Sequence, residues 1–363
     1  MLYHLALWLK GYWFPFNVFQ YISFRAWLAF LVAFLIVWAV MPRFINLLKR
    51  LYAAYGGVVR EYLEHHSDKA LTPTLGGTVI VGTLVILSFL FLRLDTPYPY
   101  LASFVLISFA LIGFVDDWLK ITKKDGLRAK VKFLLQLMFG TATAILMVKF
   151  LPIDTKIYFP FFKDLHPDLG IFYILWATLF IVGISNAVNI TDGLDGLAIG
   201  ASLTTATVLA FTAYLTGNYI YAKYLGIPYV PYAGELSILL AAFIGAGLAF
   251  LWFNTFPAKI FMGDVGSLAI GALLAFVALT TKSEFILLVA GGLFILEILS
   301  VIVQVSYFKY TKRRYGEGKR ILLMAPLHHH FEKKGWSEPQ IVVRLWILSI
   351  LFGILSLTLL KLR

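Results

Sequence analysis

Ten long apolar runs divide the chain and constrain its fold more than any other feature. A helix needs about 20 apolar residues to cross the roughly 30 Å of hydrocarbon in a bilayer, and slightly shorter runs suffice at the lower limit. Lipid offers no partners to free backbone groups, so spanning segments must be helices or a closed barrel. The runs are continuous rather than alternating, which favours helices. They cover residues 24–42, 75–94, 101–115, 131–150, 169–185, 193–216, 236–253, 265–281, 285–308 and 341–360.

We therefore expect an all-α polytopic membrane protein with about ten transmembrane helices. Residues 1–363 contain no obvious repeat or low-complexity tract, so we expect a single integral membrane domain. The aromatic stretch 1–20 lacks the compact apolar core and the cleavage site of a signal peptide. We expect this stretch to lie at the membrane interface.

The composition excludes several other classes of protein. The chain is 60% hydrophobic and 14% charged, whereas a soluble domain is about one quarter charged. It has no cysteine, which excludes disulfides, a thiolate metal site and a cysteine nucleophile. The 31 Lys and Arg exceed the 19 Asp and Glu, so the formal net charge is +12. In a membrane protein this excess belongs to loops on one face, so we expect the lipid bilayer as a partner and no nucleic acid.

The loops between ten spans alternate sides, and 21 of the 31 basic residues fall on one side. Cytoplasmic loops carry the excess of Lys and Arg. The sequence therefore predicts that both termini are periplasmic and that the basic loops are cytoplasmic.

The same loops carry acids and amides close to the ends of the spans, which indicates chemistry at the cytoplasmic face rather than at the membrane midplane. The first cluster is Asp116-Asp117, which is followed by Lys120. Adjacent helical residues point in different directions, so one carboxylate can face a metal or substrate while the other positions a lysine. The alternative is that two acids simply end a helix among compensating lysines.

The second cluster lies between the fifth and sixth runs and contains Asn186, Asn189, Asp192 and Asp195. Asp192 alone could be a helix cap. Two amides and two acids within ten residues exceed what a cap needs, so we favour a nucleotide or metal site.

The third cluster precedes the eighth run. Asp264 begins a helix, where the dipole favours an anion, and the amides of Gly266 and Ser267 are candidate phosphate donors. A carboxylate beside such a helix start is a plausible seat for Mg²⁺, which prefers hard oxygen ligands and substrate phosphates. Phe261 could stack on a base, or face lipid or the core.

The fourth cluster is the run His328-His329-His330 in the last basic loop. A helix spreads three consecutive side chains through about 200°, so they cannot converge on one metal. One or two of these histidines are expected to bind phosphate or substrate. The pair Gly291-Gly292 could bend the ninth run. Glu297, which follows it inside the run, could line a channel or pair with a neighbouring helix.

Five segments carry a family resemblance: TPTLGG, VDDWLK, SNAVNITDGLDGLA, FNTFPAKIFMGDVGSLAIG and APLHHHFEKKGW. In this order they resemble the polyprenyl-phosphate N-acetylhexosamine-1-phosphate transferase superfamily. Within this superfamily, the segment with the triple histidine resembles that of the phospho-N-acetylmuramoyl-pentapeptide-transferase family. The chain departs from the family pattern at Leu71 and Leu75, where Gly and Met are usual, and in a longer segment 310–320.

The resemblance implies a reaction in which undecaprenyl phosphate attacks UDP-MurNAc-pentapeptide, giving lipid I and UMP. It also implies Mg²⁺ as the cofactor, a bacterial inner (plasma) membrane location and a homodimer. The implied catalytic residues are Asp116, Asp117, Lys132, Asp264 and His328. Asp264 would hold the metal, together with Asn189.

The resemblance further implies a set of substrate-binding residues. Lys69 and Lys132 would meet phosphate or uridine groups, and His328 would lie near the phosphates. The implied uridine pocket consists of Asp192, Asp195, Asn254 and Phe261. The residues implied to border the sugar-peptide are Gln304, Ala325 and His329. The set also contains Asn186, Asn189 and Ser267.

Two rival functions remain open. The first is transfer of GlcNAc-1-phosphate to polyprenyl phosphate, against which the histidine run argues. The second is transport of a polyprenyl-linked sugar, which requires a polar pathway across the midplane, where only Glu297 and Gln304 stand out. The choice between direct attack and a covalent aspartyl intermediate is also open.

Overall fold

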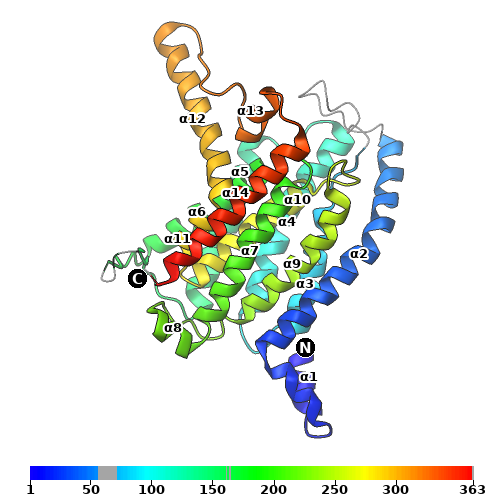
Figure 1. The fold of residues 1–363 in the computed structure, drawn as a ribbon, viewed down its shortest axis with the longest axis vertical. Helices are drawn as coiled ribbons and strands as arrows, with labels where there is room; N and C mark the ends of the chain where they lie inside the picture. The colour runs from blue at the N-terminus through cyan, green and yellow to red at the C-terminus, as the bar shows by residue number, and fades with distance from the viewer. Residues whose placement is uncertain (56–71, 161, 163–164, 362–363) are drawn as a thin grey trace.

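The computed structural model describes residues 1–55, 72–160, 162 and 165–361 and is a bundle of helices (Figure 1). Nine helices in these ranges are long and apolar enough to cross a membrane. They are α2 (Ile22–Tyr55), α4 (Tyr98–Lys123), α5 (Ala129–Phe150), α6 (Phe172–Thr191), α7 (Leu197–Thr216), α9 (Glu235–Asn254), α10 (Gly263–Thr280), α12 (Gly292–Tyr315) and α14 (Glu338–Thr358). The predicted all-α polytopic architecture is confirmed. The prediction of a single domain over the whole chain stays a prediction.

Two of the ten predicted spans differ from the structure. The run 75–94 forms α3 (Gly77–Phe91), whose 15 residues extend about 22 Å and fall short of the bilayer core. The run 285–308 was predicted as one helix, and this is wrong. The chain breaks at Gly291 into α11 (Glu284–Ala290) and α12. A Cβ at Gly292 would lie 2.9 Å from the ring of Phe352 on α14, so the close approach of α14 requires glycine at the break.

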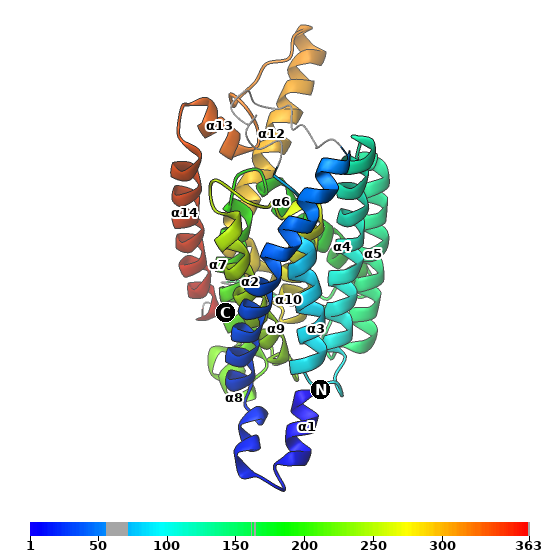
Figure 2. The same cartoon turned by 90° about the vertical axis from the view of Figure 1, so that its right-hand side faces the viewer.

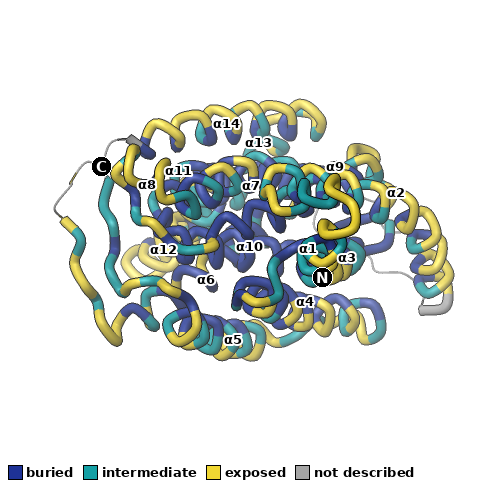
Figure 3. Tube along the Cα trace, turned by 90° about the horizontal axis from the view of Figure 1, so that it is seen from below, coloured by how far each residue is buried: buried dark blue, intermediate teal, exposed yellow. Residues whose placement is uncertain are grey.

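The helix α10 forms the centre of the bundle. All of its residues except Asp264 are buried, and Figure 3 shows it surrounded by other helices. It packs against α4 and α6, and also against α3 and α7. A Cβ at Gly113 of α4 would lie 2.2 Å from the backbone of Asp264, so this glycine allows α4 to approach the start of α10.

The two ends of the bundle carry different elements (Figure 2). The short helices α1 (Leu2–Leu9) and α8 (Tyr219–Leu225) lie at one end, with the N-terminus. The helix α13 (Leu327–Lys333) and the projecting end of α12 lie at the other. The polar clusters come together at the end that carries α13, because α4 and α6 finish there and α10 begins there.

Candidate active site

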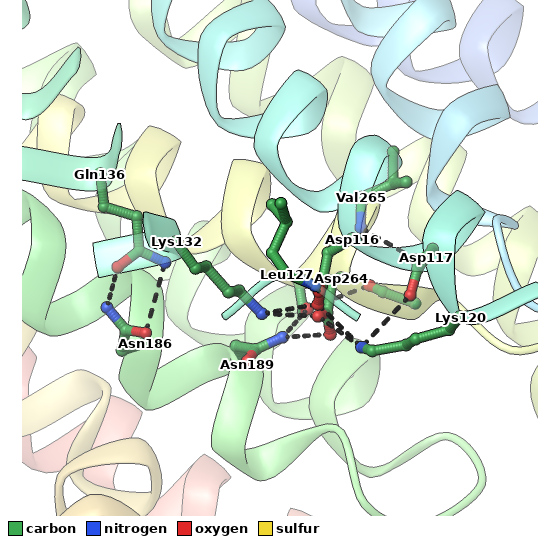
Figure 4. Close-up of polar contacts among 12 residues, drawn as sticks. Asp116, Asp117, Lys120, Leu127, Lys132, Gln136, Asn186, Asn189, Asp264 and Val265 are labelled. Atoms are coloured by element: carbon green, nitrogen blue, oxygen red, sulfur yellow. Dashed lines mark hydrogen bonds and ion pairs between the residues drawn. The ribbon is translucent and has the colours of Figure 1, made fainter. Parts of the chain in front are cut away.

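Four charged side chains from three helices form the centre of the candidate site (Figure 4). The ammonium of Lys132 lies 3.1 Å from Asp116 Oδ2 and 2.6 Å from Asp264 Oδ2. The ammonium of Lys120 lies 2.8 Å and 2.9 Å from the same two oxygens. Two cations therefore bridge one pair of carboxylate oxygens.

The other carboxylate oxygens of the cluster are also engaged. Asp116 Oδ1 accepts a hydrogen bond of 2.7 Å from the backbone N–H of Leu127. Asp117 points toward the start of α10, where its Oδ2 accepts from the N–H of Val265 at 3.4 Å. Asp264 Oδ1 accepts from Asn189 Nδ2 at 2.8 Å. The structure thus brings together Asp116, Asp117, Asn189 and Asp264, with Lys132.

Lys120 is a member of the cluster that sequence reasoning left out. The sequence analysis left it either as a lysine positioned by one of the two carboxylates or as a compensating charge, and gave it no role in the site. Its position four residues after Asp116 and three after Asp117 places all three side chains on neighbouring parts of the α4 surface. That spacing was the available signal.

The cluster has the donor chemistry that Mg²⁺ requires. Three carboxylates and two ammonium groups give it a formal charge of −1, and its oxygen atoms are hard ligands. Among the described residues, no three His, Cys, Asp or Glu side chains are arranged to hold a metal ion. Lysines occupy Asp264 Oδ2, and Asn189 turns its amide nitrogen toward Asp264 and toward Ser267 Oγ, 2.8 Å away. A cation at Asp264 therefore needs the lysines to withdraw and the amide of Asn189 to rotate.

Asn186 forms an amide pair rather than joining the charged cluster. Its Nδ2 donates to Gln136 Oε1 at 2.7 Å, and Gln136 Nε2 lies 3.4 Å from its Oδ1. Gln136 follows Lys132 by one helical turn on α5, and Asn186 precedes Asn189 on α6. The pair joins the two helices next to the charged cluster, and Gln136 was not predicted.

Two of the residues expected in a uridine pocket bind the protein backbone. Asp195 Oδ2 accepts from the N–H of Ala258 at 3.0 Å. Asn254 Oδ1 accepts from the N–H of Gly196 at 3.1 Å, and its Nδ2 donates to the carbonyl of Ile260 at 2.8 Å. These bonds join the turn after α6 to the loop before α10.

The other two lie next to these segments. Asp192 is half-buried at the end of α6, and Phe261 is buried beside Ile260. Glu338, which was not predicted, accepts from the N–H of Asp195 at 2.8 Å. The uridine pocket itself stays a prediction.

Gln304 holds the chain before the triple histidine in place. Its Oε1 accepts from the N–H groups of Ile321 and Leu322, both at 3.0 Å, and its Nε2 donates to the carbonyl of Leu322 at 3.1 Å. Ala325 follows this segment and is half-buried.

The three histidines face different partners. His328 is buried against Glu297, His329 Nδ1 pairs with Glu332, and His330 Nδ1 accepts from the N–H of Leu323 at 3.1 Å. Burial, together with the nearby ammonium of Lys334, lowers the pKa of His330, which agrees with its role as an acceptor. The histidines do not form one metal site. Lys69, the remaining predicted residue, lies outside the described residues.

Comparison with known proteins identifies the family. The family model described as glycosyl transferase family 4 matches residues 99–282. The phospho-N-acetylmuramoyl-pentapeptide-transferase of Aquifex aeolicus is 52% identical over 364 residues, and that of Hydrogenobaculum sp. is 50% identical over 364 residues. The enzyme of that name from Oleidesulfovibrio alaskensis is 48% identical over 365 residues. Each comparison covers 100% of both chains. The predicted resemblance is confirmed, and the chain belongs to the phospho-N-acetylmuramoyl-pentapeptide-transferase family within glycosyl transferase family 4.

Proposed function

We propose that this transferase moves phospho-MurNAc-pentapeptide from UDP-MurNAc-pentapeptide to undecaprenyl phosphate, giving lipid I and UMP. The names and full-length identity of the relatives support this reaction. The observation that carries the proposal on the structural side is the bridging of Asp116 and Asp264 by Lys120 and Lys132 at one end of the bundle. Such a product serves peptidoglycan synthesis, and through it cell shape and division.

The proposed orientation places the end that carries α13 in the cytoplasm of a bacterium and both termini in the periplasm, with the bundle in the inner membrane. The excess of Lys and Arg that the sequence assigns to one side of the membrane supports this orientation. One substrate is a lipid and the other a charged nucleotide, so the reaction has to occur where the bilayer meets the cytoplasm. A homodimer is part of the same proposal and is tested by the mass of the purified protein.

Mg²⁺ is the proposed cofactor. Asp264 would hold it, and Asn189 would help once its amide oxygen faces the ion. When bound, a magnesium ion offsets the negative charge of phosphate groups and polarises a phosphoryl oxygen. The oxygen-rich donor set and the net negative charge of the cluster support this assignment.

The residues of the cluster have distinct proposed tasks. A phosphate oxygen of undecaprenyl phosphate attacks the sugar-bearing phosphorus, the bond between the two donor phosphates breaks, and UMP leaves with the electron pair. Asp116 orients the lipid phosphate or takes its proton, and Asp117 supports Asp116 from the next position. Lys120 and Lys132 turn from the carboxylates to the phosphates and neutralise the charge that gathers there. The Lys120 side chain is 39% exposed and that of Lys132 17%, so Lys120 is the more accessible to substrate.

The test is UMP release by the purified protein. We expect release only when UDP-MurNAc-pentapeptide, undecaprenyl phosphate and Mg²⁺ are all present. Absence of UMP with all three components would refute the proposal. UDP-GlcNAc as donor in a parallel reaction tests GlcNAc-1-phosphate transfer, and movement of a lipid-linked sugar across vesicles without UMP release tests transport.

The route of attack has its own test. A covalent aspartyl intermediate forms from the donor alone, so labelled UMP would exchange into the donor without lipid acceptor. Direct attack requires the acceptor and gives no such exchange.

A further inference from the structure

The first turn of α13 is held by a buried acid on α12 that the mechanism above does not use. Glu297 is 0% exposed. Its Oε2 accepts from the N–H of Leu327 at 2.7 Å and from the N–H of His328 at 3.4 Å. It also lies 3.2 Å from His328 Nδ1. One carboxylate oxygen therefore contacts both the backbone and the ring at the start of the helix.

This contact favours one position of the hydrogen on the His328 ring. Nδ1 and Glu297 Oε2 are 3.2 Å apart but are not aligned as a hydrogen bond. A carboxylate oxygen accepts hydrogen bonds, so its charge favours the ring form with hydrogen on Nδ1. The partner of one ring nitrogen sets the state of the other. The nitrogen on the side away from Glu297 is Nε2. Like Nδ1, it is buried and has no hydrogen-bond partner among the described residues.

The Nε2 atom of His328 faces the turn that follows α6. A Cβ built at Gly193 would lie 2.2 Å from His328 Nε2, so the ring sits directly against this glycine. Gly193 is exposed and follows Asp192 at the end of α6. The last turns of the same helix carry Asn189, which binds Asp264. His328 Nε2 therefore lies next to the turn at Gly193, and this turn follows the helix that carries Asn189 of the charged cluster.

We propose that Glu297 is a positioning residue for the transfer reaction, because it fixes the orientation and tautomer of His328 so that Nε2 meets the donor substrate at the Gly193 turn. The inference rests on the proposed function for its substrate. Nε2 accepts a hydrogen bond from the donor when the ring is neutral and donates to a phosphate oxygen when the ring is protonated. Glu297 itself does not touch the substrate.

A double-mutant cycle tests whether Glu297 acts through His328. Glu297→Leu removes both the acceptor and the charge, and we expect kcat to fall about 10- to 100-fold, the range for a lost hydrogen bond to a charged group. In a His328→Ala background, the same substitution should cause a clearly smaller loss, because only the backbone contacts at the start of α13 are then left to lose. Losses that multiply would overturn the proposal, because Glu297 would then act without His328.

A conservative variant and a control complete the kinetic test. Glu297→Gln keeps an acceptor for Nδ1 and for the backbone, so it should retain more activity than Glu297→Leu, with little change in the KM of the lipid acceptor. Equal losses in the two variants would refute the acceptor role. Glu317→Leu removes an exposed carboxylate just beyond α12 and should behave as wild type.

A spectroscopic measurement separates this inference from the proposed function. In protein labelled with ¹⁵N-histidine, the signals lost in His328→Ala identify this ring. We expect its hydrogen on Nδ1 in the wild type and a changed pattern in Glu297→Leu but not in Glu317→Leu. An unchanged pattern would overturn the inference even if UMP release is normal. A changed pattern would support the contact even if the wild type released no UMP.

Discussion

Replacement of Asp264 by asparagine is the sharpest test of the charged cluster. The substitution keeps the shape of the side chain and removes the negative charge that contacts Lys132 at 2.6 Å and Lys120 at 2.9 Å. At an effective dielectric constant near 20, each contact has a gross Coulomb energy of about 6 kcal/mol. Most of this Coulomb energy offsets the free-energy cost of removing the charges from water, so the net contribution of each contact to stability is much smaller.

The expected effects on stability and activity differ. Both lysines keep Asp116 as a partner, at 3.1 Å and 2.8 Å. The free energy of unfolding should therefore fall by less than the roughly 3–5 kcal/mol that follows complete loss of a buried partner. Metal charge stabilisation contributes several kcal/mol to a transition state of this kind, so kcat should fall about 10²-fold or more.

The measurement is UMP release over a range of Mg²⁺ concentrations, with a thermal unfolding curve for each variant. Asp125→Asn, an exposed carboxylate in the loop after α4, is the matched control and should show wild-type rates. A near-normal rate with unchanged Mg²⁺ dependence in Asp264→Asn would remove Asp264 from the proposed metal site.

Three further predictions concern the surroundings of the cluster. Lys120→Met should lower kcat about 10- to 100-fold through loss of a charge-assisted bond, and a wild-type rate of UMP release would contradict its proposed role. Gln136→Leu removes one of the two acceptors of the Asn186 amide, which keeps the carbonyl of Val182. It should lower the free energy of unfolding by about 0.5–1.5 kcal/mol, whereas Gln340→Leu at an exposed position should not. Gly113→Ala should destabilise the protein by about 1–3 kcal/mol through overpacking against α10, while Gly82→Ala, whose Cβ meets no atom of the described chain within 4 Å, should be tolerated. Equal unfolding midpoints for these two alanine variants would contradict the close helix approach.

The spanning helices could be predicted because each depends on the length and continuity of its own apolar run. At Gly291-Gly292 the sequence indicated a bend in the run 285–308, but not that one helix ends there and another begins. At the break, Phe352 of α14 packs directly on Gly292. Such tertiary contacts have no signature in the local composition.

In the site as well, local sequence predicted the polar residues, whereas their contacts depend on the tertiary structure. Asp116 and Asp264 could be predicted to lie at the same membrane face, because each stands near the end of a span on that side. The family resemblance implied that they belong to one site. Asp195 and Asn254 carry side chains that suit a nucleotide, yet both bind backbone groups of neighbouring segments. The sequence shows which groups are polar, whereas their partners depend on which loops meet in the fold.

The central position of α10 implies an order of opening within the bundle. Hydrogen exchange of buried helices requires the largest unfolding events, whereas exposed helices open locally at lower free energy. The amide hydrogens of α10 should exchange last, and those of the projecting end of α12 should exchange early. Asp264 therefore lies on the helix that is expected to exchange most slowly. Its partners lie on α4, α5 and α6, so local opening of those helices would separate them from a fixed Asp264.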